Sequence, residues 1–474
     1  MQDSNSGRTA LKAGVWYTIS AIASKAVNLL TTPIFTRMIP AADYGLAQTF
    51  VSWGTLLMVF ASLNLNYSIV RAKHDFQGQF DKYIGSLQLL QFFAASLMGV
   101  IMITFIKPVS IFMELTPALV IVLVLYLLLN PAVSLLISKN NYKFFYKGNV
   151  AISLYTAVAT VAVTFAFIFL LKENKYYAKI FGFVLPTAVL SLGYWLYSIK
   201  KKYICINLSY WKYALAISLP LIIHSLSLSA LAQSDRIMIT KYVSTEATAI
   251  YSLAYNYAAL VNIVLISTND AWMPWFHDRL FEGNLKLIRT KVKPLIMFGC
   301  MLGIGFIALA PEAIYVLGPS EYQAGKWVVG PVVLGVTASF IYQQYVHIEF
   351  HEKKTMYTSI GTIIAAGANL ILNMIFIPRF GFIAAAYTTM ICYFLLMVFH
   401  MIIANYILKK RVYNDWYMFG ALFITCGIGA VFMMLYETYL ARFLVLFILC
   451  LLYLFINKDI ILNYLKSRKT EEKV

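Results

Sequence analysis

Charged side chains are scarce in this sequence. Asp, Glu, Lys and Arg make up 12% of the 474 residues and hydrophobic residues make up 61%, with a mean hydropathy of +0.74. Soluble domains carry roughly twice that share of charge, so a soluble cytoplasmic enzyme is excluded. The apolar runs are about 20 residues long, which also excludes an outer-membrane barrel, because barrel strands alternate over about 10 residues.

Catalytic and metal-binding motifs are missing as well. The five cysteines form no CxxC pair, so we expect neither a disulfide framework nor a metal site. The sequence has no GxxxxGK[ST] phosphate loop and no GxSxG nucleophile turn. His347 and His351 are four residues apart, but Glu349 between them would point away from their shared helix face. The sequence therefore predicts no enzyme, no cofactor and no bound metal.

Long apolar runs are what the sequence does contain. Each is long enough to cross the ~30 Å hydrocarbon core of a bilayer as a helix of about 20 residues. Charged residues, prolines and glycines divide the chain into fourteen such runs. The predicted helices are 13–36, 45–70, 83–106, 117–138, 150–171, 178–199, 212–240, 247–269, 292–317, 327–349, 357–377, 381–408, 416–436 and 439–457. The sequence thus predicts an all-α polytopic membrane protein.

The basic residues predict the orientation of these helices. Most of the 38 Lys and Arg residues fall in alternate connections, which places those connections and both termini in the cytoplasm by the positive-inside rule. The net charge of +18 is therefore mainly topological, and we expect no nucleic-acid partner. Lys200, Lys201 and Lys202 lie on this side and are expected to contact anionic membrane lipids.

An internal repeat divides the predicted helices into two sets of six. Phe-Gly-Phe at 181–183 recurs at 380–382, and the pattern at 36–46 after the first helix recurs at 240–250 after the seventh. Six is even, so both halves begin on the same side and are related by a pseudo-twofold axis along the membrane normal. We expect a six-helix bundle over 1–199, a cytoplasmic linker over 200–211 and a second bundle over 212–408. Two additional helices and a cytoplasmic tail are expected over 409–474.

Two segments resemble a known family. Residues 10–50 read ALKAGVWYTISAIASKAVNLLTTPIFTRMIPAADYGLAQTF, and residues 234–239 read SDRIMI, followed by AIYSLAY at 249–255. Both resemble the polysaccharide-biosynthesis transport proteins, the O-antigen (Wzx-type) flippases of the MOP superfamily. The family usually has glycine where Ala249 stands, which is a small change.

The resemblance implies a MATE-like fold and a transport function. In such proteins two six-helix bundles enclose a cavity and alternate between inward-open and outward-open forms. Their substrate is an undecaprenyl-diphosphate-linked oligosaccharide, which they move across the plasma (inner) membrane of bacteria for surface polysaccharide synthesis. A glycan polymerase of the same pathway and a coupling proton or sodium ion are further partners that the resemblance leaves open.

Lys25 is the cleanest candidate for a substrate-binding residue. It lies about 20 Å along the first helix from Lys12, at ~1.5 Å per residue, and a charge that deep costs ~2.5–3.5 kcal/mol unless it faces water or a partner. Asn28 shares a polar stripe with it. A cation beside amide and hydroxyl groups fits a diphosphate-linked glycan, whereas a structural ion pair is the alternative.

Five further candidates lie near the ends of the first and seventh helices or along the seventh. Asp235 and Arg236 are adjacent and so point about 100° apart, which leaves three roles open: an intrabundle ion pair, coupling to an ion or proton, and substrate contact. Arg37 and Lys241 are related by the repeat, and they either snorkel at the outer interface or assist diphosphate release. His224 either lines the cavity through hydrogen bonds or relays a proton.

Other functions of the same architecture compete with the flippase. A MATE-like cation-coupled exporter would be expected to carry an acid where Lys25 stands. A lipid II flippase is chemically close. A membrane scaffold without transport activity predicts that neutralising Lys25 and Asp235 has no effect.

Overall fold

The computed structural model describes residue 27 and residues 29–458. Within that range the chain is helical without strands, and thirteen helices are long and apolar enough to cross a membrane. They correspond to the second through fourteenth predicted helices. The first, 13–36, lies mostly outside the described residues, although residues 29–38 are helical. The predicted all-α polytopic fold is confirmed.

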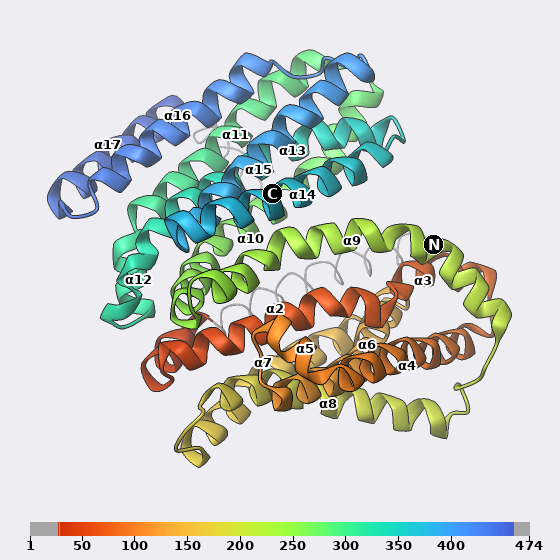
Figure 1. The fold of residues 1–474 in the computed structure, drawn as a ribbon. Coiled ribbons are helices and arrows are strands. Elements are labelled where there is room, and N and C mark those ends of the chain that lie inside the picture. The colour runs from red at the N-terminus through yellow and green to blue at the C-terminus, as the bar shows by residue number, and fades with distance from the viewer. Residues whose placement is uncertain (1–26, 28, 459–474) are drawn as a thin grey trace, which may run out of the picture. The chain divides into compact units, whose positions relative to one another are not determined.

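Figure 1 labels these helices along the chain. In chain order the elements are α2 (Ala41–Ser62), η1 (Leu65–Ser68), α3 (Ile69–Asp75), α4 (Phe80–Thr104), α5 (Ile106–Met113), α6 (Pro117–Tyr142), α7 (Tyr146–Leu170), α8 (Tyr176–Lys200), α9 (Leu208–Tyr242), α10 (Thr245–Phe281), α11 (Leu285–Ala308), α12 (Ala310–Leu317), η2 (Ser320–Gly325), α13 (Lys326–His351), α14 (Met356–Phe380), α15 (Ile383–Ile402), the π-helical η3 (Ile403–Ile407), α16 (Asp415–Met434) and α17 (Tyr439–Ile456). Several begin at side-chain caps typical of helix N-termini: Asn207 caps α9, Asn284 caps α11 and Asn414 caps α16.

The chain forms two compact units. The first unit comprises residues up to Ser252 together with Leu317–Glu321 and Thr362–Ala385, and the second unit comprises the remainder. The helices α10, α14 and α15 thus each contribute residues to both. The predicted division into bundles over 1–199 and 212–408, with a linker over 200–211 and extra helices over 409–474, stays a prediction.

The first unit is built on α2, α4, α6, α8 and α9, which pack side by side (Figure 1). Its main core draws mostly on apolar residues of α2 and α6, among them Phe50, Trp53 and Leu123, with further residues from α4, α5 and α8. The indole of Trp53 donates to the carbonyl of Met113 at 3.0 Å, which satisfies a donor that would otherwise be costly in an apolar interior. α9, which carries most of the candidate site residues, packs directly against α2 in this unit.

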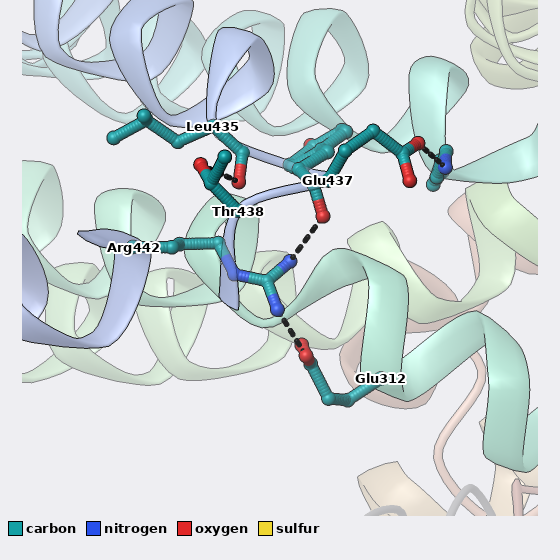
Figure 2. Close-up of polar contacts among 7 residues, drawn as sticks. Glu312, Leu435, Glu437, Thr438 and Arg442 are labelled. Atoms are coloured by element: carbon teal, nitrogen blue, oxygen red, sulfur yellow. Dashed lines mark hydrogen bonds and ion pairs between the residues drawn. The ribbon is translucent and has the colours of Figure 1, made fainter. Parts of the chain in front are cut away.

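In the second unit α11, α13 and α16 pack together and α17 contacts α11. Arg442 near the start of α17 is 2% exposed and pairs with Glu312 of α12, as Figure 2 shows. The same guanidinium donates to the carbonyl of Tyr436 at 3.4 Å. The predicted helix 439–457 contains Arg442, and the fold supplies the ion pair with Glu312 that the sequence alone does not predict.

Two helix boundaries differ from the prediction. The run at 45–70 ends at Ser62, because Leu63 and Asn64 adopt left-handed backbone conformations with φ of 48° and 49°. The eighth predicted helix, 247–269, continues as α10 to Phe281, so it spans about 55 Å at ~1.5 Å per residue. Phe276 anchors the extension: it is 0% exposed and stacks on Tyr413. Gly283, with φ of +71°, then provides the left-handed turn that separates α10 from α11.

Candidate functional site

Two of the predicted substrate-binding residues, Lys25 and Asn28, lie outside the described residues. The other candidates are described: Arg37 lies in the helical stretch 29–38, and His224, Asp235, Arg236 and Lys241 lie on α9.

Asp235 lies at the centre of a buried polar arrangement in the first unit. Its side chain is 1% exposed. One carboxylate oxygen accepts a hydrogen bond from the hydroxyl of Tyr251 on α10 at 2.5 Å, and the other accepts from the amide of Asn373 on α14 at 2.7 Å. Hydrogen bonds to an ionised group are the strong ones, worth about 1.5–3 kcal/mol each. Asp235 therefore connects α9 to α10 and α14.

The same arrangement continues along α14. Asn373 also donates to the side-chain oxygen of Asn369 at 3.1 Å, and the hydroxyl of Ser234 donates to that oxygen at 3.2 Å. Asn369 and Asn373 are both 0% exposed. They are four residues apart and so share one face of α14, which places a row of amides against the polar face of α9.

Arg236 extends the arrangement toward α2. It is 6% exposed, and its guanidinium donates to the carbonyl of Ala232 at 2.9 Å and to the side-chain oxygen of Gln233 at 3.5 Å. Gln233 in turn accepts from Ser52 of α2 at 3.1 Å. A permanently charged guanidinium is thus held between two membrane helices.

Three threonines complete the buried polar arrangement around Asp235 where α2, α9 and α10 meet. The hydroxyl of Thr240 lies 2.6 Å from that of Thr49 and 2.7 Å from that of Thr248. The backbones of α2 and α10 approach closely here. A Cβ added to Gly45 would lie only 1.7 Å from the carbonyl oxygen of Thr245. We use the name α9 polar network for Thr49, Ser52, Gln233, Ser234, Asp235, Arg236, Thr240, Thr248, Tyr251, Asn369 and Asn373.

His224 lies three turns before Asp235 on α9. Its Nδ1 is 2.8 Å from the hydroxyl of Thr362 on α14, and the residue is half-buried. This contact makes His224 a further connection between α9 and α14. Both of its predicted roles, lining the cavity through hydrogen bonds and relaying a proton, stay predictions.

Arg37 and Lys241 are exposed. The Arg37 guanidinium donates to the carbonyl of Pro33 at 2.8 Å, and the residue lines a hollow of about 340 Å³ together with Lys175 and Glu321. The ammonium of Lys241 lies 5.6 Å from the ring centroid of Phe112. Exposure fits both predicted roles of these two residues, interfacial snorkelling and phosphate release.

The second unit holds a buried cluster that the sequence analysis missed. Glu349 of α13 and His400 of α15 are both 0% exposed, and the Glu349 carboxylate lies 2.6 Å from Nδ1 of His400 and accepts from the hydroxyl of Thr358 at 2.8 Å. Nearby on α13, Nε2 of His347 lies 2.9 Å from the side-chain oxygen of Asn269. In the sequence, Glu349 stands out only as a candidate metal ligand beside His347 and His351. The contact that was missed is the one with His400, a histidine within the apolar run of another helix.

The chemistry available to the α9 polar network is binding and charge coupling. It places a carboxylate, a guanidinium, amides and hydroxyls on helices that are apolar elsewhere. Ionisable groups at such a depth cost free energy and are therefore candidates for substrate or ion contact. Among the described residues no group of three or more His, Cys, Asp or Glu side chains is arranged to hold a metal ion.

Comparison with known proteins identifies a family and a relative that covers most of the chain. A family model described as polysaccharide biosynthesis protein matches residues 10–279. The membrane protein MJ1068 of Methanocaldococcus jannaschii is 21% identical over 443 residues, which cover 85% of this chain and 86% of that protein.

Two solved structures share the fold. The lipid II flippase MurJ in an inward closed conformation matches with a TM-score of 0.67 and 15% identity, covering 94% of this chain and 100% of MurJ. An inward-facing multidrug resistance MATE family transporter of the MOP superfamily matches with a TM-score of 0.59 and 15% identity, covering 81% of this chain and 96% of that transporter. The predicted resemblance to the polysaccharide-biosynthesis family is confirmed by the family model, and the two solved structures confirm the predicted fold.

Proposed function

Because the chain belongs to the polysaccharide biosynthesis protein family, we propose that it is a flippase for a polyprenyl-diphosphate-linked oligosaccharide. It moves this lipid from the cytoplasmic to the outer leaflet of the plasma membrane by alternating access. Family membership over more than half of the chain is the observation that carries the proposal. The fold shared with a lipid II flippase supports it, since that protein also moves a lipid.

The substrate contacts in this proposal are basic and amide side chains. They are supplied by Lys25 and Asn28 on the predicted first helix, by Arg236 within the α9 polar network, and by Arg37 and Lys241 near the helix ends. Guanidinium and ammonium groups bind phosphate oxygens through charge-assisted hydrogen bonds. Such contacts within an apolar bundle select an anionic headgroup over a neutral lipid.

Asp235 is the proposed coupling group, with His224 as a second titratable side chain on the same helix. The hydrogen bonds of Asp235 to Tyr251 and Asn373 are strong while the carboxylate is charged. Protonation or cation binding at this carboxylate weakens them and so favours a different packing of α9 against α10 and α14. A coupling proton or sodium ion would act through this change.

The orientation with cytoplasmic termini rests on the distribution of Lys and Arg. In that orientation Arg37 and Lys241 lie at the outer face, where the substrate is released, and a glycan polymerase of the same pathway would receive it there. The outer location of these two residues distinguishes a release role from the binding role proposed for Lys25 and Arg236.

The test is the leaflet distribution of polyprenyl-diphosphate oligosaccharide in cells depleted of the protein. Wild type, Lys25→Ala, Arg236→Gln, Asp235→Asn and the exposed control Lys172→Ala are each restored at matched expression. We expect depletion to accumulate the lipid at the inner leaflet, and wild type and Lys172→Ala to clear it. Loss of one charge-assisted contact of ~1.5–3 kcal/mol predicts a roughly 10- to 150-fold slower clearance for Arg236→Gln and Lys25→Ala.

The outcomes separate the function from the site. Normal lipid distribution after depletion would refute the flippase. Full rescue by Lys25→Ala and Arg236→Gln would keep the flippase and refute these residues as its binding site.

Two other transport functions are tested in the same cells. A lipid II flippase is favoured by the TM-score of 0.67 over 94% of the chain, and a MATE-like exporter by the second shared fold. Accumulation of lipid II on depletion would support the former. Loss of cationic dye efflux with normal lipid distribution would support the latter.

A further inference from the structure

A second cluster of charged residues lies in the first unit, away from the α9 polar network. Asp81 at the start of α4 accepts from Lys139 at the end of α6 at 2.7 Å and from Lys143 just after α6 at 2.9 Å. Lys139 is only 7% exposed, whereas Lys143 is exposed. Two ammonium groups against one carboxylate leave this cluster with a net charge of about +1 at neutral pH.

Aromatic rings surround the buried ammonium. The Nζ atom of Lys139 lies 5.8 Å, 5.9 Å and 5.5 Å from the ring centroids of Tyr194, Tyr197 and Tyr203. The segment that carries Tyr203 is held close to α4, because a Cβ on Gly85 would be 2.3 Å from the carbonyl oxygen of Tyr203. Cation–π contacts stabilise a charge at the edge of an apolar region, so Lys139 is fixed in position.

The cluster opens into a hollow of about 540 Å³, within the ~300–1,000 Å³ range of small-molecule sites. Its lining is charged at one end and apolar along α8. The lining residues are Asp81, Leu136, Lys139, Asn140, Lys143, Phe145, Val189, Leu190, Gly193, Tyr194 and Tyr197. Val189 is 59% exposed, and a Cβ on Gly193 would meet no atom within 4 Å, so the apolar end is open.

We propose that this hollow binds an anionic phospholipid. Its phosphate lies against Lys139 and Lys143, and the upper part of an acyl chain lies along Val189, Leu190 and Gly193. A net positive cluster beside an open apolar groove on a membrane helix matches a headgroup with one negative charge and an attached chain. Lys200, Lys201 and Lys202 follow at the end of α8, on the predicted cytoplasmic side. Such basic clusters attract anionic lipid.

The site is distinct from the proposed transport path, because none of its lining residues belongs to the α9 polar network. Bound lipid would hold the end of α6 against α4 and α8. The inference does not depend on which substrate the protein moves.

Native mass spectrometry of the full chain in detergent tests the proposal. The probes are dioleoyl-phosphatidylglycerol, dioleoyl-phosphatidylcholine with the same chains, and inorganic phosphate. Wild type is compared with Lys143→Gln, with Gly193→Leu, which fills the apolar end, and with the control Lys147→Gln, an exposed lysine that does not line the hollow. Leucine forms helix better than glycine, so Gly193→Leu is expected to fold, and its melting temperature checks this.

We expect phosphatidylglycerol to bind wild type more tightly than phosphatidylcholine, and inorganic phosphate not to compete. Lys143→Gln should weaken phosphatidylglycerol binding about fivefold, Gly193→Leu should weaken it by at least as much, and Lys147→Gln should leave it unchanged. Equal binding of both lipids, equal effects of Lys143→Gln and Lys147→Gln, or wild-type binding by Gly193→Leu would each overturn the proposal. Full competition by inorganic phosphate would show a phosphate site instead of a lipid site.

Discussion

Gly45 offers a sharp test of the packing that holds the α9 polar network. A Cβ at this position would lie 1.7 Å from the carbonyl oxygen of Thr245 and 3.1 Å from the amide nitrogen of Ala249. A carbon and a carbonyl oxygen normally come no closer than about 3.3 Å. Gly45→Ala therefore forces the first turns of α2 and α10 apart by about 1.6 Å.

The structure resists this movement through buried hydrogen bonds. Thr49 bonds Thr240 at 2.6 Å, and Thr240 bonds Thr248 at 2.7 Å, so separating α2 from α10 stretches at least one of these contacts. Overpacking costs about 1–3 kcal/mol, and a lost hydrogen bond adds about 0.5–1.5 kcal/mol. We expect Gly45→Ala to lower the free energy of unfolding by about 2–4 kcal/mol.

The matched control is the same substitution where space is open. Gly193→Ala on α8 meets no atom within 4 Å and should raise the free energy of unfolding by about 0.5–1 kcal/mol, because alanine favours helix over glycine. Reversible unfolding of both variants in mixed detergent micelles gives the comparison. A Gly45→Ala variant as stable as wild type would show that α2 and α10 do not approach as described, and the reasoning would fail.

Two further predictions concern ion pairs of the second unit. Arg442→Gln leaves Glu312 without its ion-pair partner and should lower the free energy of unfolding by about 1–3 kcal/mol. This loss is smaller than for a fully buried pair, because the Glu312 side chain is 38% exposed. A double-mutant cycle with Glu312→Gln measures the coupling energy, and additive effects of the two substitutions would contradict the prediction. Lys326 lowers the pKa of the Glu437 carboxyl below its usual value near 4.5 through an ion pair of 2.5 Å. The stability from this pair is therefore present above pH 4.5 and lost as the pH falls through the lowered pKa. Melting temperatures of wild type and Glu437→Gln should converge at acidic pH, and a constant difference from pH 6 to pH 3 would be the contrary result.

The repeat illustrates what residue patterns predict well and what they do not. The match of 36–46 to 240–250 holds structurally, since Gly45 and Ala249 are each the fifth residue of their helices, α2 and α10. The match of 181–183 to 380–382 is weaker, because Gly182 lies inside α8 whereas Gly381 lies between α14 and α15 with φ of +74°. The same residue types thus adopt different backbone conformations in these two segments.

Some residues of the candidate site are predictable from the sequence, and their hydrogen-bond partners are not. Asp235 and Arg236 are predictable as candidates because charged residues inside apolar runs are rare. The partners Tyr251 and Asn373 are not predictable in this way, since many polar residues of other helices would satisfy the same carboxylate. Glu349 was considered only as a metal ligand beside His347 and His351, and its contact with His400 was not predicted because His400 lies on another helix, 51 residues further along the chain.

The sequence by itself determined the membrane class, the helices and the family. Those properties depend on composition over stretches of about 20 residues and on local motifs, which need no knowledge of neighbours in space. Only the tertiary structure decided that Asp235 joins α9 to α10 and α14, that Arg442 is buried with Glu312, and that Lys139 is enclosed by tyrosines. The reason is that a partner is selected by where helices distant in sequence cross, and the apolar pattern of each helix is compatible with many crossings.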